Sequence, residues 1–194
     1  MLQHVPILVL LALAATGCGT TSSARLTMPD VPTDAFVVHD VRTEDDRRTR
    51  TEVQSKWVVV HFGDESISPA PLTTTSRWLH ANLRNELAAK QVELRAFSVN
   101  VTVSDAKVDE LQFHTAARVT PSILGVPVAY AAILSIESLR SRKLIEAMVD
   151  VGVEGQRFTG LAQRSVRGRV TESDVADTVQ DALASLVRQY KATP

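Results

Sequence analysis

The chain has 194 residues, of which 21 are Lys or Arg and 22 are Asp or Glu, giving a formal charge of −1 at pH 7. This balance disfavours nucleic acid as a partner, because nucleic-acid-binding domains usually carry a basic excess. The single cysteine, Cys18, excludes an internal disulfide and a cysteine-based metal cage.

The N-terminal apolar run spans residues 5–15 and precedes Cys18 closely. It is too short for a transmembrane helix, which needs about 20 apolar residues, but it matches the apolar core of a secretory signal peptide. The sequence Ala15-Thr16-Gly17-Cys18 resembles the bacterial lipobox. The resemblance implies that residues 1–17 are a signal peptide and that Cys18 is lipidated. The alternative is a buried N-terminal helix whose cysteine serves as a small hydrophobe.

Residues 18–34 are predicted to be the lipidated cysteine and a flexible tether, because small polar residues follow Cys18 and two prolines lie further on. The residue after the cysteine is Gly19. Under the sorting rule of enteric-type bacteria, the absence of Asp there implies the outer membrane. We therefore expect a lipid-anchored protein that faces the periplasm.

Residues 35–190 are predicted to form a single domain, beginning with strands and a charged loop. Alternating or continuous apolar residues indicate strands, whereas mixed charge without an apolar period over residues 43–54 indicates a solvated loop or a strand end. In residues 92–104 the apolar side chains change face near Ala96, which predicts a bulge or burial on both faces. The predicted strands cover residues 35–42, 56–62, 92–104, 143–154 and 156–165.

Two amphipathic helices complete the prediction. The first covers Thr73–Lys90, with leucines at every fourth position from Leu79. The second begins at Thr171, where Asp174 forms a capping-box-like pair. Together with a hairpin turn at Glu154-Gly155, these elements predict an α+β fold. Its architecture is a two-layer sandwich, in which two helices cover one face of a mostly antiparallel sheet.

An apolar segment at residues 121–136 separates the third and fourth strands. Gly125 and Pro127 interrupt it, and we expect a loop followed by a helix from about residue 128 to 140. The segment is interpreted as core, or alternatively as a surface that contacts a partner, the bilayer or another copy of the chain. The candidate contact residues are Ile123, Leu124, Val126, Val128, Tyr130 and Ile133.

Two short motifs extend the lipoprotein resemblance into the domain. Asp40-Val41-Arg42 ends the first predicted strand, and Phe62-Gly63-Asp64 precedes the first helix. With the final hairpin and helix, this pattern resembles small bacterial lipoproteins of the YajG type. More distantly, it resembles the lipoprotein plug of the lipopolysaccharide export machine. The resemblance implies no catalytic residue.

The sequence offers little support for catalysis or cofactor binding. His39 and His61 lack metal-ligand spacing, so no metal site or other cofactor is expected. The alternative is a hydrolase in which one of these histidines meets Asp40, Asp64 or a serine. A basic stretch (Arg157, Arg164, Arg167 and Arg169) is interpreted as a solvated sheet face rather than a surface for anionic headgroups.

The function predicted from sequence is therefore that of a non-catalytic binding or scaffold lipoprotein of the envelope. Its partners would be the membrane, through Cys18, and an envelope protein or glycolipid. The alternatives are the hydrolase described above and a self-assembling component that uses residues 121–136.

Overall fold

The computed structural model describes residues 21, 23–54, 57–104 and 142–193. The described elements, in chain order, are β1 (Ala24–Arg25), β2 (Val38–Asp40), η1 (Asp45–Arg47), β3 (Arg50–Gln54), β4 (Trp57–His61), η2 (Asp64–Ser66), β5 (Ile67–Ser68), α2 (Pro71–Leu87), β6 (Val92–Ser104), β7 (Arg142–Val153), β8 (Gln156–Arg167) and α5 (Glu172–Ala192).

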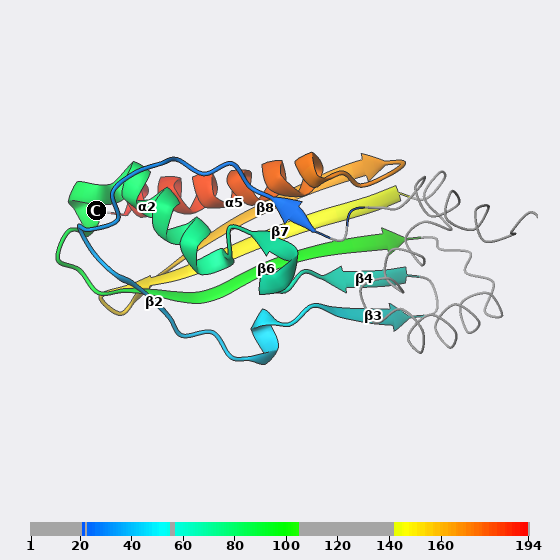
Figure 1. The fold of residues 1–194 in the computed structure, drawn as a ribbon, viewed down its shortest axis with the longest axis horizontal. Coiled ribbons are helices and arrows are strands. Elements are labelled where there is room, and N and C mark those ends of the chain that lie inside the picture. Colours follow the sequence, from blue (N-terminus) through cyan, green and yellow to red (C-terminus); the bar gives the residue numbers. More distant parts are fainter. Residues whose placement is uncertain (1–20, 22, 55–56, 105–141, 194) are drawn as a thin grey trace, which may run out of the picture.

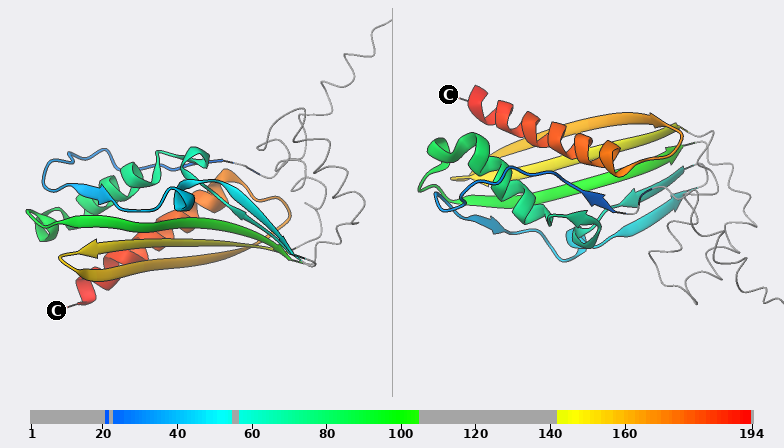
Figure 2. Two further views of the ribbon diagram at one scale, coloured as in Figure 1. Left: turned by 90° about the horizontal axis from the view of Figure 1, so that it is seen from below. Right: turned by 45° about the horizontal axis from the view of Figure 1, so that its top comes forward.

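These elements form two layers, as Figure 1 shows. The main sheet has the order β3-β4-β6-β7-β8, all antiparallel, and β2 pairs with β6 in parallel. β1 and β5 form a second, two-stranded parallel sheet. α2 and α5 lie on the same face of the main sheet (Figure 2). The predicted α+β class with a mostly antiparallel sheet and two helices is confirmed.

The long strands follow the apolar alternation of the sequence. In β7 the side chains from Ile145 to Val153 alternate, and every second one is buried beneath the helices. In β6 the register shifts between Leu94 and Ala96. This bulge explains the change of face seen in the sequence, because it places Val92 and Leu94 on the same buried side as Phe97.

The β7–β8 hairpin and the start of α5 also match their predictions. Glu154 and Gly155 form the turn, with φ values of 50° and 84°. The Thr171 side chain accepts from the backbone N–H of Asp174, and the Asp174 carboxylate accepts from the Thr171 backbone N–H at 2.9 Å. This capping box satisfies otherwise unpaired donors at the helix start.

Several predicted boundaries were wrong. α2 begins at Pro71 rather than Thr73, because proline is well suited to the first helical position, where its missing N–H is not needed. Residues 43–54, expected to be a solvated loop or a strand end, contain η1 and the complete edge strand β3. The first predicted strand shrinks to the three residues of β2.

The predicted tether was also too long. Ala24 and Leu26 are only 2% and 4% exposed, and Met28 packs against the core. Ala24 pairs with Ile67 in the small parallel sheet. Residues 24–28 therefore belong to the folded body and not to the flexible tether predicted for residues 18–34. The helix expected over residues 128–140 lies outside the described residues.

Candidate functional site: the uncovered face of the sheet

One face of the main sheet carries both helices, and in the described part of the chain the other face carries no helix or strand (Figure 2). We call it the open face. α5 lies over β7 and β8, and α2 contacts β6 on the covered side. Many side chains of the open face are only partly buried, including Leu144 and Met148 on β7. This face is therefore a regular surface of partly buried side chains.

A polar row crosses the open face. Direct cross-strand pairing joins one residue from each of five adjacent strands: Arg50, His61, Asn100, Glu146 and Gln163. His61 Nδ1 lies 2.7 Å from Asn100 Oδ1, and Gln163 donates to Glu146 Oε1 at 2.7 Å. Directly opposed side chains on a sheet interact with one another. The row is therefore a set of oriented donors and acceptors held by rigid strands.

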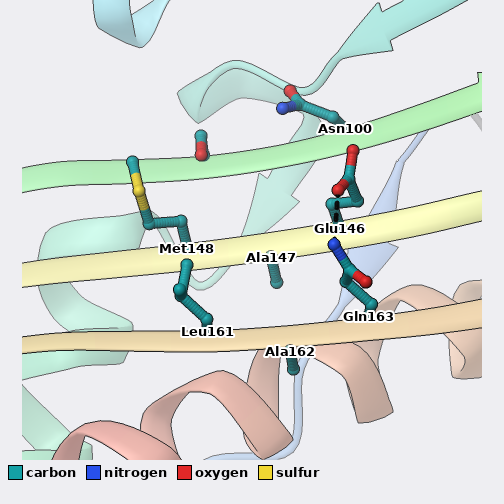
Figure 3. Close-up of a pocket in the computed structure, with 8 residues that line it drawn as sticks. Asn100, Glu146, Ala147, Met148, Leu161, Ala162 and Gln163 are labelled. Atoms are coloured by element: carbon teal, nitrogen blue, oxygen red, sulfur yellow. Dashed lines mark hydrogen bonds between the residues drawn. The ribbon is translucent and has the colours of Figure 1, made fainter.

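A shallow hollow of about 550 Å³ lies beside this row (Figure 3). Its polar side consists of Ser98, Asn100, Glu146 and Gln163, and its apolar side chains are those of Met148 and Leu161. Leu161 is 61% exposed, although most large apolar side chains of the described strands are buried. A volume of this size falls within the range of ligand sites. The mixture of groups suits a partner with both apolar and hydrogen-bonding parts.

A second polar cluster lies apart from the open-face hollow. The Arg42 side chain is fully buried and binds two carboxylates. It donates to Asp40 at 3.0 and 2.8 Å and to Asp64 at 2.9 and 3.0 Å. The two short motifs found in the sequence therefore meet in space, with every carboxylate oxygen directed at the guanidinium. This arrangement ties the end of β2 to η2.

The contacts within this cluster shift the pKa of Asp40. Burial by itself raises the pKa of Asp40, but hydrogen bonds and charge from Arg42, aided by Arg47, outweigh it and hold the pKa below its ordinary value of 3.8. Burial likewise opposes the charge of Arg42, and the two carboxylates raise its pKa in compensation.

The predicted alternative site for hydrolysis is not assembled in the described residues. Asp40 and Asp64 do converge, but on Arg42. His61 contacts Asn100 instead, and its Nε2 lies 3.2 Å from Glu52 Oε1 without a hydrogen bond. His39 is exposed on β2. No group of three or more His, Cys, Asp or Glu residues suited to a metal ion occurs among the residues described.

Two predicted sites lie outside the described residues. One is Cys18, and the other is the contact segment containing Ile123, Leu124, Val126, Val128, Tyr130 and Ile133. Within the described ranges, no helix has the length and apolar character needed to span a membrane.

The polar row was not predicted from the sequence. The alternation within β7 does show which of its side chains lie on the uncovered face. Glu146 and Met148 alternate with the buried residues of β7, which places them on the opposite face. The alternation does not reveal which strands lie side by side or in which register. Comparison of the chain with known protein families, curated proteins and solved structures found no match.

Proposed function

We propose that this protein is a lipid-anchored lipoprotein of the bacterial envelope that binds a partner through the open face and catalyses no reaction. The observation that carries the binding role is the hollow beside the polar row, which combines exposed Leu161 with the oriented groups of Asn100, Glu146 and Gln163. The partner class is an envelope protein or a glycolipid, since both present apolar and hydrogen-bonding groups.

The anchor in this proposal is Cys18, and the location is the periplasmic side of the outer membrane. Its support is the lipobox-like sequence Ala15–Cys18 and the presence of Gly19 after the cysteine. Lipidation of this kind holds a protein at a membrane, because each buried methylene contributes about 0.8 kcal/mol and two or more chains make the attachment stable.

Metabolic palmitate labelling followed by membrane fractionation tests the anchor. We expect label on the wild-type protein and none on Cys18→Ala, which would move to the soluble fraction. Unlabelled wild-type protein in the soluble fraction would remove the anchor from the proposal.

Substitution of exposed apolar residues tests the binding face separately. Leu161→Asp is expected to abolish complexes captured by crosslinking in intact cells, whereas Val37→Asp is expected to preserve them. The pair is matched, because the two side chains are 61% and 64% exposed and Val37 lies outside the hollow. Equal recovery of crosslinked partners from both variants would exclude the open face as the binding surface.

A further inference from the structure

The described chain begins at one end of the main sheet. The backbone N–H of Thr21 donates to the carbonyl of Val170 at 3.2 Å, in the connection between β8 and α5. Cys18 and Thr21 are three residue steps apart in the chain, and a fully extended chain spans at most about 3.6 Å per residue. The Cys18 Cα therefore lies within about 11 Å of the Thr21 Cα.

The basic stretch noted in the sequence divides at this end of the sheet. Arg157 is bound to buried Asp150 near the hairpin, and Arg164 pairs with Asp177 and Asp181 of α5. Arg167 and Arg169 are exposed, and neither forms an ion pair within the described part of the chain.

Arg167 and Arg169 both lie just before the residue that Thr21 contacts. Arg169 directly precedes Val170, whose carbonyl binds Thr21, and Arg167 is the last residue of β8. The next acid along the chain, Glu172, is exposed and forms no ion pair among the described residues. Asp174, which follows it, is engaged by Thr171 in the capping box of α5. Two arginines without an ion-pair partner among the described residues thus lie close to Thr21, which is three residue steps along the chain from Cys18.

We propose that this end of the sheet is a membrane-contacting surface on which Arg167 and Arg169 bind the phosphates of anionic phospholipids in the leaflet that holds the anchor. This inference rests on the proposed lipidation of Cys18 for its orientation. The electrostatic attraction between cations and an anionic leaflet contributes to membrane binding. Arginine also presents paired N–H donors that match the geometry of a phosphate.

The opposite end of the molecule is then held away from the bilayer. β8 has 12 residues, and a strand rises about 3.3 Å per residue, so the Glu154-Gly155 turn lies roughly 40 Å from Arg167. The C-terminal end of α5 lies near the same turn (Figure 1), where the rings of Phe158 and Tyr190 are 4.9 Å apart. The short connection and the basic end together orient the strands away from the membrane surface. The open face then remains exposed to the periplasm.

Vesicle partitioning tests the basic surface without requiring lipidation. In the full Cys18→Ser chain, binding to phosphatidylglycerol-containing vesicles is compared with binding to phosphatidylcholine vesicles, so that the contribution of residues 1–17 cancels. Arg167→Gln with Arg169→Gln is expected to lower this ratio by about thirtyfold, from the attraction typical of two cations near an anionic surface. The matched control, Arg188→Gln with Lys191→Gln, removes two exposed charges from the opposite end and is expected to change it by less than about threefold.

An equal loss in both double variants would show a general net-charge effect and overturn the proposal. A ratio near one for the parent chain would do the same. Loss of a crosslinked acidic protein in the Arg167/Arg169 variant, without any change in the vesicle ratio, would assign this end to a protein partner instead.

Fluorescence quenching on the lipidated protein tests the orientation. A fluorophore is introduced at exposed Ser165 or at exposed Glu154, and the quencher is a headgroup-labelled lipid. Strong quenching at position 165 with none at 154 is expected. Equal quenching at both positions would show a body that lies flat, and none at either would show one that swings free. Palmitate labelling of the same samples separates these outcomes from a failure of the anchor.

Discussion

At residue 42, a guanidinium without solvent exposure holds two carboxylates that come from separate parts of the chain. Asp40 lies at the end of β2, and Asp64 begins η2. This geometry stabilises the buried charge of Arg42, because each carboxylate accepts hydrogen bonds from two of its N–H groups. Such bidentate hydrogen bonds are both strong and directional. Removal of the arginine would leave two partly buried negative charges facing each other.

Arg42→Met is therefore expected to lower the free energy of unfolding by about 3 kcal/mol, the lower end of the range for breaking a buried pair, because Asp64 remains partly solvated. Urea denaturation of the purified variant measures the loss. Arg48→Met is the control, since its ion pair with Glu44 is largely exposed and its loss is expected to stay within about 0.5 kcal/mol. Similar midpoints for the two variants would contradict a structural role for the cluster.

The same cluster predicts a dependence of stability on pH. The pKa of Asp40 is lower in the folded protein than its ordinary value of 3.8. A depressed folded pKa gives stability that is present above pH 3.8 and is lost as the pH falls through the folded pKa. Urea midpoints measured from pH 6 down to pH 2 are expected to decline more steeply for the wild-type protein than for Asp40→Asn. Parallel curves would show that Asp40 does not contribute.

At the scale of elements, the close approach of α5 to β8 depends on Gly160. A Cβ added at this position would lie 2.0 Å from the backbone oxygen of Ala182 and 2.7 Å from Cβ of Leu186. The contact with Ala182 involves helix backbone, which cannot move aside as a flexible side chain can. Glycine at this position therefore sets the distance between the two layers.

Gly160→Ala is expected to destabilise the fold by about 2 kcal/mol or more, because overpacking a core forces backbone shifts. Thermal or urea unfolding measures the effect. Ser165→Ala on the same strand is exposed and is expected to change stability by less than about 0.5 kcal/mol. A stable Gly160→Ala variant would mean that α5 can move away from β8 without loss of packing.

The capping box at the start of α5 is expected to make a smaller contribution to stability than Gly160. Thr171→Ala removes the hydroxyl that caps the helix and is expected to cost about 1 kcal/mol. In an Asp174→Ala background the same change is expected to cost less, because the two side chains satisfy each other. A double-mutant cycle by urea denaturation measures this coupling, and strictly additive losses would argue against a reciprocal capping box.

Elements with a strong periodic pattern could be predicted from sequence, whereas the contacts between elements could not. The alternation of β7 and the Thr171 cap are local signals, so strand, turn and helix were identified correctly. β3 was missed because Arg50 and Glu52 face solvent and the strand has a partner on one side only. The polar row needs the strand order, and the Arg42 cluster needs two distant segments to meet. Neither is encoded in local periodicity.

At the scale of the whole molecule, the two-layer design leaves one sheet face available and fixes where the chain enters. The hydrogen bond from Thr21 to Val170 and the burial of Ala24 leave only residues 18–20 of the proposed tether before the first described contact with the folded body. A lipoprotein with so short a connection holds its folded body next to the bilayer. The direction in which the open face points then depends on this connection as well as on the sheet.

Lengthening the connection is expected to separate anchoring from orientation. A Gly-Ser insertion of about ten residues between Thr20 and Thr21 adds flexible reach without altering the body. We expect unchanged palmitate labelling and an unchanged urea midpoint, because Thr21 and everything after it keep their contacts. Quenching at Ser165 by headgroup-labelled lipid is expected to fall, since the chain no longer confines the basic end to the membrane surface. Full quenching retained in the insertion variant would show that Arg167 and Arg169 hold the body upright without help from the short connection.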